Sequence, residues 1–188
     1  MIIYSNATLP TTLVVSLVEV KAWLKIDGTD DDTLLTSLIA SATAECEAYA
    51  GLSFITRTRT VKLSYFSGKE IILPYGPVTS LTSIDYVDPD DASQTVDPGD
   101  YTVDIASGLA RVRVTESWPY TSLGLSNVVV TYVAGYANAA AVPEIIKTAI
   151  KKKIAVDYEK RGDTMENSDS WMKTLDPIKV YWNAEYCY

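Results

Sequence analysis

The chain changes its hydrophobic period twice, and this change constrains the fold more than any other feature. From Phe54 to Phe66 the side chains follow a period of two, which is typical of a half-buried strand. Threonines crowd one face, and the other face carries Ile55, Arg57, Arg59, Val61, Leu63 and Tyr65. Over residues 31–50, apolar side chains instead recur at steps of three and four, as on one face of a helix. They are Leu34, Leu35, Leu38, Ile39, Ala42, Cys46 and Tyr49. A second helical pattern occupies residues 144–161. We therefore expect helices on both sides of a β-rich middle.

The expected helices have recognisable ends. Ser16 and Glu19 have the spacing of a capping box, so a short helix should begin there and run to about Lys25. Gly51 suits the position that follows a helix, where φ is positive. Pro143 suits the start of the later helix because its φ is already helical. The helix beginning there should bury Ile145, Ile146, Ala149, Ile150, Ile154 and Tyr158.

Short β-strands are expected through the middle of the chain. The turn residues Gly, Pro and Asp separate apolar stretches at 70–73, 80–87, 101–105, 109–114 and 127–134. Strands divided in this way predict an antiparallel sheet or a small barrel. The expected fold class is α+β, in which N-terminal and C-terminal helices pack together as one helical body and the β-rich part is inserted between them.

Five segments follow from these patterns. We expect a flexible N-terminal arm without regular structure (1–15), the N-terminal helices (16–52), the β-rich insertion (53–135), the C-terminal helix (143–162) and an aromatic C-terminal tail (163–188).

Composition argues against several functions. The net charge is −8 and the sequence has no histidine. The acidic balance disfavours a phosphate-binding face, and the lack of histidine removes the commonest general base and zinc ligand. We find no phosphate loop, no dinucleotide fingerprint, no secretory signal and no apolar run long enough to cross a bilayer. The two distant cysteines, Cys46 and Cys187, suit a reducing cytosol, with Cys46 buried as a free thiol.

We therefore expect no catalytic site, no cofactor, no metal and no membrane association. Two acidic segments, at 27–32 and 88–91, superficially resemble calcium loops. A loop starting at Asp27 would need a glutamate where Leu38 stands, and one starting at Asp30 would need it at Ser41. The segment is better explained as a helix start, and the cluster at 88–91 as a turn. A hydrolase that uses a carboxylate pair stays an alternative, since 24 acidic residues allow many pairings.

Two groups of residues are candidates for a partner interface. Large apolar residues gather in the tail, where they either pack on the chain's own helices or dock into a partner: Trp171, Leu175, Ile178, Tyr181 and Trp182. Lys151 and Lys152 belong to a basic run in the later helix. They form either a solvated face or a contact with an acidic neighbouring subunit.

A family resemblance rests on motifs that occur in consistent order over residues 16–161. They are the segments 20–26, 31–42, 47–51, 72–78, 81–88, 100–101, 118–119, 130–136, 142–150 and 158–161. Each motif alone is weak, but the series resembles the head–tail connector, or adaptor, proteins of tailed double-stranded DNA bacteriophages.

The resemblance implies a structural role without catalytic residues. Connector subunits would form a homo-oligomeric ring between the portal protein and a tail-completion or stopper protein, and genomic DNA would pass nearby without specific binding. A closed ring of this kind requires heterologous interfaces. The implied location is the head–tail junction of the virion, after assembly in the host bacterial cytoplasm, with the C-terminal segment docked on the portal. Another neck or tail-completion protein of the virion is the alternative function.

Overall fold

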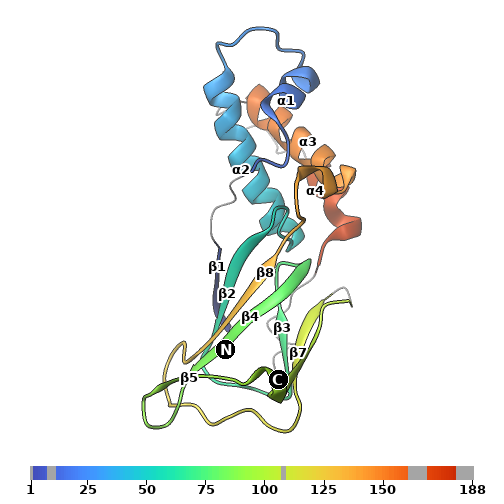
Figure 1. Cartoon of the computed structure of the whole chain (residues 1–188). Coiled ribbons are helices and arrows are strands. Elements are labelled where there is room, and N and C mark those ends of the chain that lie inside the picture. Colours follow the sequence, from blue (N-terminus) through green and yellow to red (C-terminus); the bar gives the residue numbers. More distant parts are fainter. Residues whose placement is uncertain (1, 8–11, 107–108, 161–168, 181–188) are drawn as a thin grey trace. The chain divides into compact units, whose positions relative to one another are not determined.

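The computed structural model describes residues 2–7, 12–106, 109–160 and 169–180 (Figure 1). The chain divides into two compact units. We call one the helical unit; its described residues lie within 10–55 and 136–180. The other is the sheet unit, whose described residues lie within 1–9 and 56–135. The helical unit is thus built from two segments on either side of the β-rich middle, as the alternation of periods predicts.

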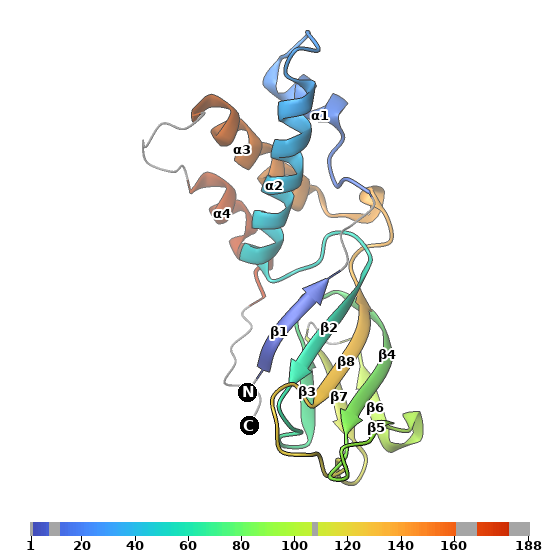
Figure 2. The same cartoon turned by 90° about the vertical axis from the view of Figure 1, so that its left-hand side faces the viewer.

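The helical unit contains four α-helices among the described residues. They are α1 (Leu17–Leu24), α2 (Asp32–Ala50), α3 (Glu144–Lys160) and α4 (Ser170–Leu175), with short 3₁₀ turns η2 (Ala139–Ala141) and η3 (Asp176–Ile178). Both views place α2 beside α3 (Figures 1 and 2). One apolar core joins all four helices, with Val20, Leu35, Ile39, Ile150 and Leu175 among its members. The predicted packing of N-terminal on C-terminal helices is confirmed.

Helix α1 begins with the predicted capping box. The Glu19 N–H donates to the Ser16 Oγ at 3.2 Å, and the Ser16 N–H donates back to the Glu19 carboxylate at 2.8 Å. The bonds from the Ser16 backbone N–H and hydroxyl lower the pKa of Glu19 below its ordinary value of 4.5. Because folding lowers the pKa of Glu19, the ionised carboxylate stabilises the fold at pH values above its ordinary pKa. This contribution is lost as the pH falls through the lowered pKa.

Replacing Ser16 with alanine should lower the free energy of unfolding by about 1 kcal/mol at neutral pH, because it removes this cap. The deficit should shrink under acid conditions, where Glu19 is protonated in both proteins. This difference in the free energy of unfolding can be measured at several pH values by urea denaturation followed by helical circular dichroism. Ser37→Ala, at an exposed position within α2, is the matched control. A deficit that stays constant down to strongly acid pH would contradict the capping explanation.

Helix α2 ends at Gly51, which adopts a φ of 66°. A Cβ atom at this position would lie 2.8 Å from the Val180 carbonyl oxygen, so only glycine fits. The Val180 N–H donates to the Ala50 carbonyl at 2.9 Å. The end of α2 therefore anchors the segment that follows α4.

The sheet unit consists of two antiparallel sheets. One has the strand order β1-β2-β8-β4-β5 and the other the order β3-β7-β6. The strands are β1 (Ile2–Ala7), β2 (Arg57–Leu63), β3 (Glu70–Leu73), β4 (Val78–Val87), β5 (Ser93–Thr95), β6 (Tyr101–Asp104), β7 (Ala110–Val114) and β8 (Val128–Ala134). An apolar core includes residues of both sheets, such as Val61, Ile71, Val112 and Val130. An inserted antiparallel β-structure is confirmed.

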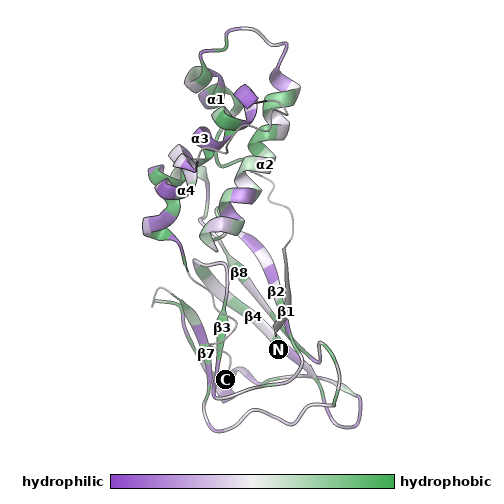
Figure 3. Ribbon diagram, turned by 180° about the vertical axis from the view of Figure 1, so that it is seen from behind, coloured by the Kyte–Doolittle hydropathy of each residue, from purple (hydrophilic) through white to green (hydrophobic). Residues whose placement is uncertain are grey.

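Alternation determines which face of β2, β7 and β8 is buried. In β8, Val128, Val130, Tyr132 and Ala134 are buried and the residues between them are half-exposed. Figure 3 shows hydrophobic and hydrophilic residues along the elements. The β2 face predicted to include Arg59 is also buried, and the Arg59 guanidinium lies 4.1 Å from the centroid of the Tyr75 ring. Stacking on the aromatic ring compensates for this burial of a cation.

Two strands were not predicted. The arm expected to lack regular structure contains β1, which pairs with β2 from Ile2↔Leu63 to Ala7↔Arg59. Strand β5 pairs Ser93 and Thr95 with β4, although its residues are all exposed. Both are edge strands, which pair through the backbone with one neighbouring strand, and a distant pairing of this kind leaves little local signal in the sequence.

The acidic segments have structural roles. Asp31 accepts a hydrogen bond from the Tyr158 hydroxyl at 2.6 Å, and Asp32 forms an ion pair with Lys21 at 2.7 Å. Asp88 accepts the Ala92 N–H at 2.9 Å within a turn, and this bond is the main cause of its lowered pKa. Among the described residues, no cluster of His, Cys, Asp and Glu could hold a metal ion, and no helix is long and apolar enough to span a membrane.

Candidate protein interface

The tail residues of the predicted interface lie in the helical core where they are described. Trp171 is 5% exposed, and Leu175 is fully buried. The Trp171 ring packs edge-on against Tyr49, with centroids 5.4 Å apart. Of the two interpretations of the tail, packing on the chain's own helices therefore holds for these two residues. Ile178 is half-buried against the same core, and Tyr181 and Trp182 lie outside the described residues.

The basic run of α3 also has partners within the helical unit. The Lys151 ammonium lies 5.5 Å from the centroid of the Trp23 ring, and Lys152 donates to the Thr174 hydroxyl at 2.9 Å. Lys153 pairs with Asp157 at 2.6 Å and with Glu45 at 3.0 Å. Burial alone would lower the pKa of Lys153, but these two carboxylates outweigh it and raise the pKa. A contact between Lys151 or Lys152 and a neighbouring subunit stays a prediction.

The sheet unit exposes large apolar side chains on the loop of residues 115–127, between β7 and β8. Tyr120 is 88% exposed, Leu123 102% and Leu125 79%. Single exposed apolar residues are ordinary on protein surfaces, but three on one short loop concentrate exposed apolar surface in one segment. We call this segment the apolar loop.

Hydrogen bonds hold the apolar loop in place along its length. The Thr115 N–H donates to the Asp100 carbonyl at 2.8 Å, and the Ser122 N–H donates to the Val87 carbonyl at 2.9 Å. The Ser122 hydroxyl also donates to Asp91 at 2.8 Å, and the Asn127 amide donates to the Ser122 carbonyl at 2.6 Å. The exposed side chains are therefore presented by a tethered backbone, which lowers the ordering cost of binding a partner.

An aromatic cluster supports the start of this loop. The Trp118 indole stacks on Phe66, with centroids 4.7 Å apart and planes inclined by 5°. Phe66 in turn packs edge-on against Tyr86 at 5.9 Å. The Trp118 Nε1 is buried without an acceptor among the described residues. Burying an unpaired donor costs about 1–3 kcal/mol, so the stacking must outweigh that cost.

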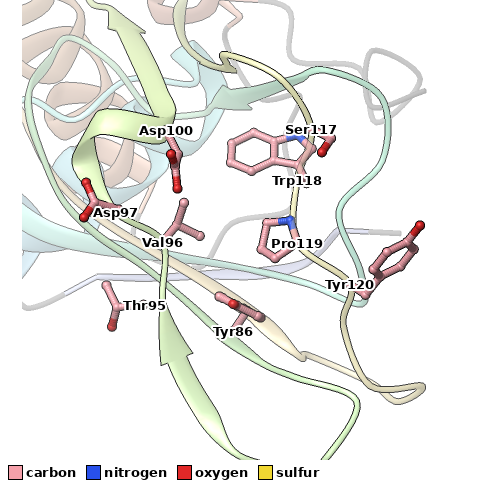
Figure 4. Close-up of a pocket in the computed structure, with 9 residues that line it drawn as sticks. All are labelled: Tyr86, Thr95, Val96, Asp97, Asp100, Ser117, Trp118, Pro119 and Tyr120. Carbon is pink, nitrogen blue, oxygen red and sulfur yellow. The ribbon is translucent and has the colours of Figure 1, made fainter.

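A hollow of about 390 Å³ lies beside the cluster (Figure 4). We call it the aromatic hollow; its lining is Tyr86, Thr95, Val96, Asp97, Asp100, Ser117, Trp118, Pro119 and Tyr120. Figure 4 shows Asp100 and Trp118 facing each other across it, with Val96 below Asp100. A second hollow of about 500 Å³ shares residues 117–120 and includes Tyr65 and Leu123.

The aromatic hollow is acidic. Asp97 and Asp100 line it, whereas none of its lining residues is lysine or arginine. Between Lys69 and Arg111 the sequence contains eight acidic residues and no basic one: Glu70, Asp85, Asp88, Asp90, Asp91, Asp97, Asp100 and Asp104. Nearby, burial and then the charge of Asp97 raise the pKa of Tyr101. The lining therefore combines aromatic surface with two carboxylates and no basic side chain.

A family model named "Head completion protein" matches residues 13–172. The chain belongs to the head completion protein family. This confirms the resemblance to phage head–tail connector proteins, and the match includes the apolar loop and the aromatic hollow. No curated protein sequence matches the chain.

Solved structures share the fold of this head completion protein. The neck of an empty gene transfer agent (GTA) particle, computed with C6 symmetry, contains a chain with a TM-score of 0.81 and 18% identity. A chain from the virion of the native particle gives a TM-score of 0.79 and 20% identity, and one from the native neck computed with C12 symmetry gives 0.74 and 18%. Each match covers 96% of this chain and 97% of the other. At these identities the likeness establishes the fold.

The apolar loop is an interface candidate that the sequence analysis did not predict. Trp118 and Pro119 entered only as part of the family motif series, and Tyr120, Leu123 and Leu125 were not singled out. The sequence offers only a weak signal for this loop: it contains large apolar residues but follows neither a helical nor an alternating period. Without a period, a sequence does not indicate whether such side chains are buried or exposed.

Trp118 can be tested through paired substitutions. Trp118→Phe should change the free energy of unfolding by no more than about 1 kcal/mol, because it keeps a ring on Phe66 and removes the unpaired N–H. Trp118→Ala should cost about 2–3 kcal/mol, less than a fully buried tryptophan, because the hollow leaves one side of the ring open. Urea denaturation compares the three proteins. If Trp118→Phe lowered the free energy of unfolding as much as Trp118→Ala does, the indole N–H would have to make a stabilising hydrogen bond, contrary to this prediction.

Proposed function

We propose that this head completion protein is a structural subunit of the neck of a phage-like particle, at the head–tail junction of the virion. The family match over residues 13–172 carries the proposal. Likeness over nearly the whole chain to subunits from GTA necks supports it. A structural role also agrees with the described residues: the buried Glu47 and Tyr132 and the half-buried Lys153 have partners within the chain that hold the fold.

The finer proposal is a connector that forms a homo-oligomeric ring between the portal protein and a tail-completion or stopper protein. The symmetric necks in which similar chains occur support a ring. In a closed ring each subunit uses two different faces, and exposed apolar surface such as the apolar loop suits such contacts. The net charge of −8 suits a wall past which genomic DNA moves, because an acidic surface repels phosphate.

Cryo-electron microscopy of the purified protein mixed with the portal protein of its particle tests this function. The expected result is a ring in contact with the portal, into which both units can be fitted. A protein that contacts only the tail side would instead be another neck or tail-completion component, the alternative function. Portal alone is the control. Absence from the neck of purified particles would contradict both functions.

We further propose that the residues after Val180 dock on the portal, because Tyr181 and Trp182 follow a segment anchored on α2 by the bond from Val180 to Ala50. A chain ending at Val180 should keep the helical core and lose portal binding in a co-sedimentation assay. The matched control is Val18→Ser, which changes an exposed apolar residue of α1 that belongs to none of the proposed interfaces. Equal portal binding by the truncated and full chains would contradict tail docking.

A further inference from the structure

We infer that the aromatic hollow is a docking site for an arginine or lysine side chain on an extended segment of a different protein. The inference goes beyond the proposed function, which supplies only the setting: a neck, where neighbouring proteins meet. The chemistry of the occupant follows from the residues that form the hollow.

The hollow presents negative charge that no described residue neutralises by an ion pair. Asp97 uses one carboxylate oxygen to accept the Gly99 N–H at 2.8 Å, and its charge remains available. Asp100 holds the start of the apolar loop through its backbone carbonyl, so its carboxylate has no part in that bond. A cationic side chain is the complementary occupant, because it would form charge-assisted hydrogen bonds with both carboxylates.

Aromatic surface favours the same occupant. Trp118 faces Asp100 across the hollow, and Tyr86 and Tyr120 also line it. A guanidinium group can stack on an indole face while its edge donates to a carboxylate, so arginine fits this pairing better than lysine. The Arg59–Tyr75 stack shows the same contact within this unit.

Other classes of ligand fit less well. Phosphate, nucleic acid and anionic lipid would be repelled by the two carboxylates and the acidic stretch around them. A divalent cation would need more oxygen ligands than these two side chains offer, and no group of three metal-ligating residues occurs in the described part of the chain. The exposed Tyr120 and Leu123 beside the hollow suit apolar residues that flank the basic one.

Titration of the isotope-labelled full chain with short peptides tests the inference by nuclear magnetic resonance. The probes are acetyl-Leu-Arg-Leu-amide and its counterparts with citrulline or glutamate at the centre. The indole N–H of Trp118 is the reporter, assigned by its absence from the Trp118→Phe spectrum. The arginine peptide should shift this signal and bind at least about fivefold more tightly than either counterpart. Added salt should weaken the binding of the arginine peptide more than that of the other two peptides, because salt screens the attraction between charges.

Paired variants localise the effect. Asp97→Asn/Asp100→Asn should weaken arginine-peptide binding by about fivefold or more, because both changes keep the shape and remove the charge. Asp90→Asn/Asp104→Asn removes the same charge outside the hollow and should leave the affinity unchanged. Spectra of the free variants confirm that each is folded.

Three outcomes would overturn the inference. The first is no shift of the Trp118 signal at about 10 mM peptide, which corresponds to a dissociation constant too weak for a specific site. The second is equal binding of the arginine and glutamate peptides. The third is a shift of the same signal with protein concentration alone, which would make a second copy the occupant. None of these results bears on whether the protein lies in the neck, which microscopy decides separately.

Discussion

Trp171→Ala is expected to lower the free energy of unfolding of the helical unit by about 3–5 kcal/mol. Trp171 is buried in the core that joins α2, α3 and α4, so the change leaves a large cavity. The substitution also removes two contacts of the Trp171 ring. One is the edge-on packing against Tyr49, and the other is the cation–π contact with the Lys153 ammonium, which lies 5.9 Å from the ring centroid. Urea denaturation followed by helical circular dichroism measures the loss.

The control for this prediction is Met172→Ala, which truncates the next side chain of α4 at a half-buried position. It should cost about 1–2 kcal/mol, because less apolar area leaves water in the native state. Trp171→Phe should fall between the two. If Trp171→Ala destabilises no more than the methionine variant, then the tail does not dock on the helical core in solution.

Tyr132→Ala is expected to destabilise the sheet unit by about 3–5 kcal/mol. Among the residues whose burial the structure describes, Tyr132 is the largest fully buried side chain, and it lies in the central strand β8. Its hydroxyl donates to the Pro74 carbonyl at 2.7 Å in a buried position, so the substitution leaves both a cavity and an unpaired carbonyl. Unfolding can be measured in urea through the amide protection of β8.

Tyr132→Phe isolates the hydrogen bond from the ring. It should cost about 1–2 kcal/mol, since a buried acceptor loses its partner while the packing stays. Val133→Ala, at the neighbouring half-exposed position of the same strand, should cost about 1 kcal/mol or less. A phenylalanine variant as unstable as the alanine variant would mean that the bond to Pro74, and not the ring, accounts for the stability.

The two units relate differently to the proposed function. In the helical unit, the residues expected to meet a partner are largely committed to internal contacts: Trp171 and Leu175 are buried, and Lys151 and Lys152 touch Trp23 and Thr174. In the sheet unit, the apolar loop presents exposed side chains on a tethered backbone next to an acidic, aromatic hollow. The sheet unit therefore offers the better defined surface for a neighbour in the particle.

Local patterns predicted the elements that have a strong local signal. The helix at 31–50 was predicted to within one residue of α2, because its apolar stripe and its terminal Gly51 are both encoded nearby. The capping box of Ser16 and Glu19 and the strand at 70–73 are further cases. In each, residues within a few positions of one another provide the hydrogen bonds or the buried face that define the element.

By itself, then, the sequence determined the α+β order, the buried faces of the main helices and strands, and the family, because these depend on periodicity, caps and local motifs. Only the tertiary structure decided what lies far apart in sequence and close in space. Strand β1 exists because β2 offers its edge, and Trp171 is buried because α2 and α3 provide a site for it. The apolar loop stays exposed because Asp100, Val87 and Asp91 hold it from other segments. Such contacts depend on which surfaces meet after folding, and no local pattern records them.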